Sequence, residues 1–338
     1  MSEIAAAGIR PRWRSSLDAG AEMARRTPDV RRVLQLALAG IWLLDALLQY
    51  QSFMYSKAFS QMIGATASGN PGAVASPITW DATLVSHHAV LLNSIFATIQ
   101  LLLAIGISWR PTVRLALAAS IAWALGVWWF GEGLGMILTS SASPVNGAPG
   151  AVIIYALLAV LLWPADRAGR PAPFTAARAI GAPVARALWL VLWLSLAYFA
   201  LLPENRAPQG LNGMIASMES GEPGWLAALE RSAASLVAHQ GLAASIVLAI
   251  VLVIIAMGVY LPASAAKATL VLAIVVAAVI WVFGEAFGGI LTGGGTDPNS
   301  GPLLILLALT YWPVTAAMAA RQAPPSPPAS ANEGIAAS

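Results

Sequence analysis

Few side chains in this sequence are suited to catalysis or ligand binding, and most of them stand inside or beside apolar runs. An ionisable group in such a run is costly to bury and usually faces a bundle interior or a wet cavity. Candidate ligand- or ion-binding residues are three histidines, three carboxylates and one glutamine: Asp45, Gln49, His87, His88, Glu132, His239 and Glu285.

The histidines allow two interpretations. A neutral imidazole ligates metals and haem, and a glutamate can complete a mixed site. There is no pair of histidines four residues apart, and adjacent His87 and His88 point about 100° apart on a helix, so at most one of them easily joins His239. The alternative is an interfacial histidine that is hydrogen-bonded to a loop.

Asp45 lies deep in the run IWLLDALLQYQ, with Gln49 one turn later on the same face. It is a candidate proton-relay group, cation ligand or partner for a buried donor such as His87 or His88. The other interpretation is that Asp45 makes a hydrogen bond within the helix bundle that has only a structural role.

The composition indicates a membrane protein, because 58% of the residues are apolar and only 10% are charged, against about 25% charged in a typical globular protein. There is no cysteine, so redox chemistry would need a bound cofactor. We predict an all-α protein with eight membrane spans at 33–50, 84–107, 112–136, 150–163, 187–202, 239–260, 268–291 and 302–319.

The basic residues predict the orientation. With the N-terminus in the cytoplasm, the outer loops hold only Lys57, Arg206 and Arg231 of the 18 basic residues. The positive-inside rule therefore favours both termini in the cytoplasm and a location in the bacterial inner membrane. The formal charge of +3 reflects this orientation, and we expect no nucleic-acid partner.

The two halves of the chain resemble each other. WWFGEGLGMILTSSASPVNGAPG at 128–150 is echoed by WVFGEAFGGILTGGGTDPNSGPL at 281–303, and an offset of 152 carries His87 onto His239. We predict two tandem four-helix repeats in parallel orientation. The same offset carries Asp45 onto Ala197, Asn93 onto Ser245 and Gln100 onto Leu252.

The repeats define the expected domains. A disordered cytoplasmic tail (1–32) precedes the first repeat (33–164), a cytoplasmic linker (165–186) joins it to the second (187–320), and a disordered tail (321–338) follows. The outer segments 51–83 and 203–235 are expected to form short amphipathic helices on the outer surface. His87, His88, Glu132, His239 and Glu285 would then share one layer near the outer face, with Asp45 below it.

The motifs FGEGLGMILTSSASPVNGAPGAV and HHAVLLNSIFATIQ resemble a family of bacterial multi-pass membrane proteins whose function is unassigned. This resemblance covers nearly the whole membrane region and implies a fold without an activity. A four-helix unit with a cytoplasmic N-terminus is also similar in architecture to the DoxX/DoxD membrane redox proteins, although their motif residues have no counterparts here.

Three functions follow from these patterns. The leading hypothesis is binding or transport of a small solute or cation through the outer polar layer. The second is a membrane redox component that binds haem, copper or quinone, and the third is a structural subunit of an envelope complex. The sequence has no nucleotide-binding, HExxH or GxSxG motif, and all three functions share the lipid bilayer as a partner.

Overall fold

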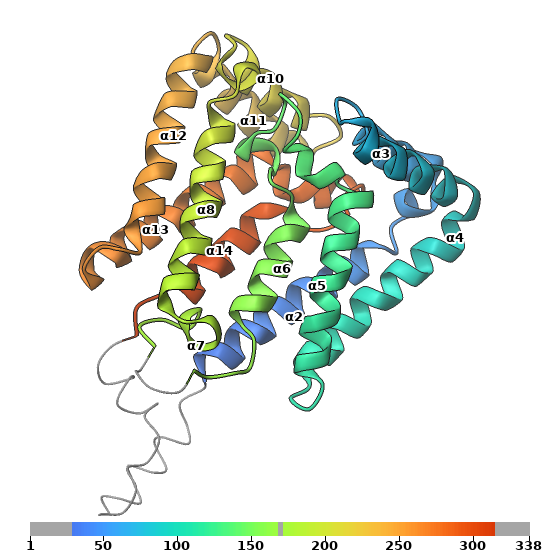
Figure 1. Cartoon of the computed structure of the whole chain (residues 1–338). Helices are drawn as coiled ribbons and strands as arrows, with labels where there is room; N and C mark the ends of the chain where they lie inside the picture. The colour runs from blue at the N-terminus through green and yellow to red at the C-terminus, as the bar shows by residue number, and fades with distance from the viewer. Residues whose placement is uncertain (1–28, 168–171, 315–338) are drawn as a thin grey trace, which may run out of the picture.

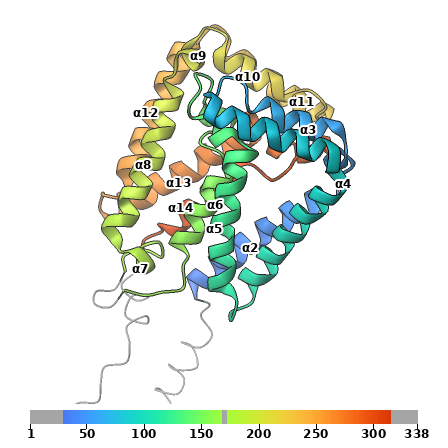
Figure 2. The ribbon, with the colours of Figure 1, turned by 45° about the vertical axis from the view of Figure 1, so that its right-hand side comes forward.

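The computed structural model of the chain describes residues 29–167 and 172–314, and it is helical throughout these segments (Figure 1). Two groups of helices stand side by side, with α4 and α5 in one group and α8 and α12 in the other (Figures 1 and 2). This confirms the predicted all-α fold class. The predicted disordered tails lie outside the described residues, except for residues 29–32, which open the first helix.

The first half contains five α-helices: α2 (Val30–Leu48), α3 (Lys57–Ala65), α4 (Gly72–Ser108), α5 (Val113–Phe130) and α6 (Ala151–Leu161). Helix α2 packs against α4, and α5 packs against both α4 and α6. Short 3-10 turns, η1 (Ser52–Tyr55), η2 (Gly133–Met136) and η3 (Pro144–Asn146), connect them.

The second half has a similar order, but two helices, α11 and α12, stand where the first half has the single helix α4. Its α-helices are α7 (Ala177–Ile180), α8 (Ala182–Ala200), α9 (Pro203–Arg206), α10 (Gly210–Met218), α11 (Gly224–Val237), α12 (Gly241–Gly258), α13 (Ala263–Val279) and α14 (Ser300–Thr310). Between α13 and α14 lie a π-helical turn, η4 (Ile280–Gly284), and the 3-10 segment η5 (Ala286–Thr292). Helix α8 packs against α12 as α2 packs against α4, and the two short helices α6 and α14 contact each other.

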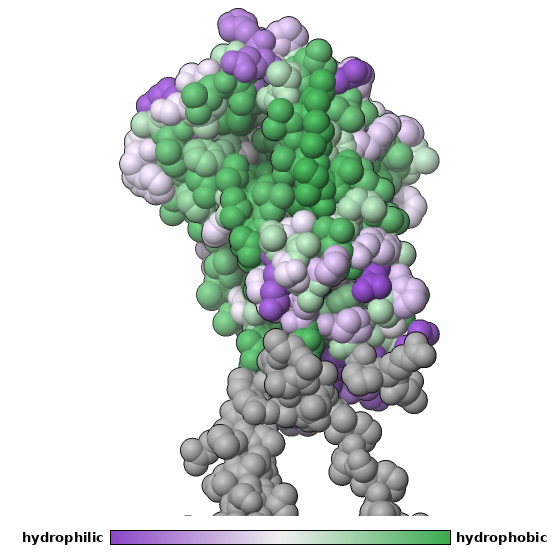
Figure 3. All heavy atoms as spheres, turned by 90° about the vertical axis from the view of Figure 1, so that its left-hand side faces the viewer, coloured by the Kyte–Doolittle hydropathy of each residue, from purple (hydrophilic) through white to green (hydrophobic). Residues whose placement is uncertain are grey.

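Five helices of the described residues, α4, α5, α8, α12 and α13 with its π-helical extension, are long and apolar enough to cross a membrane. The chain is therefore a multi-pass membrane protein. On the face that carries α12, a broad apolar band lies between two polar zones (Figure 3), and aliphatic side chains such as Val247 and Ile250 are exposed there. Lipid chains are the natural solvent for such a surface.

Three of the eight predicted spans do not correspond to any of these five helices. Helix α2 has 19 residues, but Arg31, Arg32 and Asp45 lie within it. Helices α6 and α14 have only 11 residues each, or about 16 Å at 1.5 Å per residue, whereas the hydrocarbon core is about 30 Å thick. Both short helices are largely buried, and they contact each other.

Those loops contain a turn of left-handed backbone in each half. Residues 133–136 have φ between 56° and 61°, and residues 286–289 have φ between 45° and 74°. A Cβ on Gly135 would lie 1.9 Å from the Pro149 carbonyl oxygen, and one on Gly288 would lie 2.5 Å from that of Asp297. The recurring glycines therefore allow a close approach of two loop strands that no larger residue permits.

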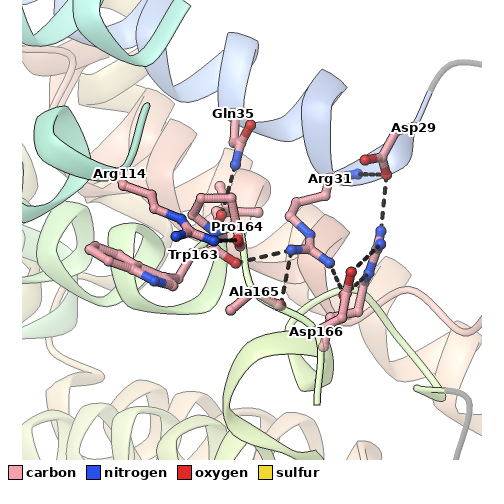
Figure 4. A network of polar contacts seen from close by, with 10 residues as sticks. Asp29, Arg31, Gln35, Arg114, Trp163, Pro164, Ala165 and Asp166 are labelled. Carbon is pink, nitrogen blue, oxygen red and sulfur yellow. Dashed lines mark hydrogen bonds and ion pairs between the residues drawn. The ribbon is translucent and has the colours of Figure 1, made fainter. Parts of the chain in front are cut away.

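A polar network joins the first turn of α2 to the chain that follows α6 (Figure 4). The buried Arg31 guanidinium donates to the carbonyls of Trp163 at 3.1 Å and Ala165 at 3.0 Å, and pairs with Asp166. Gln35 donates to the Leu162 carbonyl at 2.9 Å. These donors hold the chain that follows α6 against the beginning of α2.

Candidate functional site

The two recurring glutamates occupy equivalent positions at the beginnings of the short helices. Glu285 accepts hydrogen bonds from the backbone amides of Ser300 at 3.2 Å and Gly301 at 3.0 Å, and also from the Ser300 hydroxyl. Glu132 accepts one from the Val152 amide at 3.4 Å. The first amides of a helix have no helical acceptors and favour negative charge. Each glutamate therefore caps the following half-length helix.

The tryptophans one turn before these glutamates also have equivalent partners. Trp128 donates to the Pro149 carbonyl at 2.7 Å, and Trp281 donates to the Pro298 carbonyl at 2.8 Å. These bonds place Pro149 and Pro298 at matching positions. The FGE motif and the following loop thus form one structural unit, present in both halves.

The three histidines occupy exposed positions within α4 and between α11 and α12. His88 has non-helical backbone angles inside α4, and His239 separates α11 from α12 with φ of 62°. His87 Nδ1 lies 2.8 Å from the Thr83 carbonyl oxygen, and His239 Nδ1 lies 3.1 Å from Gln209 Nε2. The ligand role predicted for these histidines remains a prediction.

The first half encloses a cavity of about 590 Å³ between α2, α3, α4 and α5. At its rim, Trp80 is 61% exposed and Phe130 is 37% exposed, whereas Trp42 and Asp45 are only 1% exposed. The cavity therefore runs from an open rim at the beginning of α4 and the end of α5 to a buried end at α2. None of the three histidines lines it.

Four polar side chains of its lining have buried acceptor atoms without a hydrogen-bond partner in the protein: Asp45 Oδ1, Gln49 Oε1, Gln100 Oε1 and Glu132 Oε2. The other carboxylate oxygen of Asp45 accepts a hydrogen bond of 2.5 Å from the Tyr155 hydroxyl. A buried acceptor without a donor costs about 1–3 kcal/mol. Several of them around one cavity indicate a site built for a donor that is not part of this chain.

The structure adds Asp297, which sequence reasoning missed. Asp297 belongs to the loop before α14 in the second half, yet it lines the cavity of the first half. It accepts hydrogen bonds from the Asn299 amide at 2.7 Å and the Thr296 hydroxyl at 2.8 Å. Because Pro149 matches Pro298, the residue at the equivalent position is Ala148. The ungapped alignment of residues 128–150 with 281–303 instead pairs Asp297 with Pro144, so this equivalence is visible only in the structure.

The cavity's polar residues are absent from the equivalent positions of the second half. Asp45, Gln49 and Gln100 correspond to Ala197, Leu201 and Leu252 at an offset of 152. Tyr155 corresponds to Leu304 when the two prolines are aligned. The glutamate caps, in contrast, are present in both halves.

Burial determines the protonation of the loop carboxylates. It raises the pKa of Glu132 well above its usual value, and the nearby Asp297 carboxylate raises it further. Burial also raises the pKa of Asp297. The pKa of Glu285 rises to about 7, because burial outweighs its hydrogen bonds from Ser300 and Gly301. Among the described residues, no cationic side chain offsets the hydration that these three carboxyl groups lose on burial.

No protein-family model, curated protein or solved structure matches this chain. The resemblances to the family of multi-pass proteins and to DoxX/DoxD proteins therefore remain predictions. Any functional inference rests on the cavity and its residues.

Proposed function

We propose that this protein binds a small solute in the cavity of its first half, as a binding or transport protein of the bacterial inner membrane. The observation that carries the proposal is the set of unpartnered acceptors on Asp45, Gln49 and Gln100 around one cavity. Such groups are costly in a merely structural bundle, and ligand sites combine apolar walls with a few polar groups of this kind.

The proposal includes two tandem four-helix repeats, 33–164 and 187–320, and eight membrane segments with both termini in the cytoplasm. Its support is the equivalent helix order of the two halves and the arginines at one end of the bundle. Arg31, Arg114 and Arg178 contact the chain just after α6 or the carboxylate of Asp166 there. The positive-inside rule places that end in the cytoplasm and the cavity rim toward the outer face.

Repetition of the glutamates was a reason to expect a function for them. Their contacts instead support a structural role, since each caps a buried helix. The solute site that we propose depends on Asp45 and Gln49 of the predicted residues, with Gln100, Tyr155 and Asp297 in addition, and Glu132 also lines its cavity.

Thermal unfolding of the purified protein with four probes tests solute binding: tetramethylammonium, glutamate, sucrose and ubiquinone-1. We expect at least one probe to raise the midpoint of the wild type and not that of a Gln49→Leu, Gln100→Leu variant, which carries the second-half residues. A ligand in hundredfold excess over its Kd stabilises by about 2.7 kcal/mol. Equal shifts in both proteins, or none, would reject the proposal; a shift by ubiquinone-1 alone would favour the redox hypothesis.

A further inference from the structure

The charge of the cavity is one-sided. Four carboxyl side chains line it, Asp45, Asp81, Glu132 and Asp297, and among the described lining residues there is no lysine, arginine or histidine. Asp45 is almost fully buried, and its free oxygen has no partner in the protein. A cation in the cavity would favour the ionised form of these carboxyl groups and be attracted by it, whereas an anion would find no positive partner among the described lining residues.

Aromatic rings form much of the remaining wall. Trp80 and Phe130 lie at the rim with ring centroids 6.5 Å apart, and Phe96 and Trp123 lie deeper with centroids 5.6 Å apart. Trp42 lies at the buried end. The face of an aromatic ring attracts a cation by about 0.5–2 kcal/mol, and quaternary ammonium groups are commonly held in this way.

The spacing of the carboxylates distinguishes a metal ion from a larger cation. A metal ion needs several ligand atoms within about 2–2.6 Å of one point. In the part of the chain that the structure describes, no three His, Cys, Asp or Glu side chains are close enough to hold one. Carboxylates distributed around a cavity of about 590 Å³ instead suit a cation with an extended, partly apolar body.

We propose that the cavity selects organic cations, with an ammonium group near Asp45 and Asp297 and an apolar body against the aromatic rings. This inference rests on the proposed function and specifies its class of solute. Such a cation would supply the positive charge that the Asp45 carboxylate lacks. It would also supply the donor or positive charge that the side-chain oxygens of Gln49 and Gln100 lack.

Because the chain has no cysteine, a single introduced thiol can report on the cavity. Gly126 lines it, and a Cβ there would have no atom within 4 Å. We would measure the rates at which Gly126→Cys in detergent reacts with a trimethylammonium-ethyl and a sulfonato-ethyl methanethiosulfonate. Each rate is divided by that of Ala73→Cys, an exposed position outside the cavity.

The expected result is a normalised rate at least about tenfold higher for the cationic reagent, as opposite charges within a shielded site imply. The preference should fall in Gly126→Cys proteins that also carry Asp297→Asn. Similar rates, or a faster anionic reagent, would overturn the cation inference but leave an accessible cavity. If Ala73→Cys reacts and neither Gly126→Cys nor Ala122→Cys does, the cavity is closed and the proposed function fails with it. Ala122→Cys also serves if Gly126→Cys does not fold.

Discussion

The two halves of this protein share their architecture and differ in their interiors. Both use a glutamate to cap a short buried helix and a tryptophan to hold the loop before it. Only the first half places Asp45, Gln49 and Gln100 around a cavity; the second half has Ala197, Leu201 and Leu252 there. The shared residues therefore maintain the fold, with Glu132 also lining the cavity, whereas the unshared ones distinguish the proposed site.

The largest expected effect comes from removing a cap. Glu285→Ala leaves the Gly301 amide and the Ser300 hydroxyl without their acceptor, while the Ser300 amide keeps only Asn299 Oδ1 at 2.8 Å, and it should destabilise the protein by about 3 kcal/mol. Glu132→Ala removes a single bond of 3.4 Å and should cost about half as much. Denaturant titration of the purified variants measures both.

Glu204→Ala, at an exposed position, is the matched control and should be near neutral. Glu285→Gln keeps an acceptor and should fall between the wild type and Glu285→Ala. If the two cap variants were as stable as the control, the shared glutamates would need a functional explanation.

The sequence was sufficient to predict the helical membrane fold, because long apolar runs have few alternatives in a bilayer. It also indicated where the FGE motifs and the deep Asp45 lie. The left-handed turns could not be predicted, since their glycines are required by contacts with Pro149 and Asp297, residues of a loop whose path depends on the whole fold. Asp297 reaches the cavity across the boundary between the halves, and no local pattern reports such a contact.

A smaller effect concerns an unshared carboxylate of the second half. Glu230 in α11 is 0% exposed and corresponds to Ile78 at an offset of 152. Burial, with Glu222 and Glu219 nearby, raises its pKa to about 7; Glu219 is itself paired with Arg231. An acid whose pKa is higher in the folded state binds more protons there, so stability falls as pH rises from the unfolded-state pKa toward 7.

We therefore expect the unfolding midpoint to fall between pH 5 and pH 8 partly because of this group. Glu230→Gln should reduce that decline by an amount on the order of 2 °C, and Glu204→Gln at an exposed position should not change it. If the midpoint declined equally in the wild type and in Glu230→Gln, the pKa of Glu230 would not be raised in the folded protein.

We propose that the polar interior of the first half serves a ligand and not the fold. The most direct test is the thermal stability of a ligand-free variant with the second-half residues, Asp45→Ala, Gln49→Leu and Gln100→Leu, together with Tyr155→Phe to remove the hydroxyl that bonds Asp45. Because each change removes a buried polar group without creating an unpaired one, the account predicts a midpoint equal to or above that of the wild type. A loss of stability comparable with that of Glu285→Ala would contradict it and assign these residues to the fold.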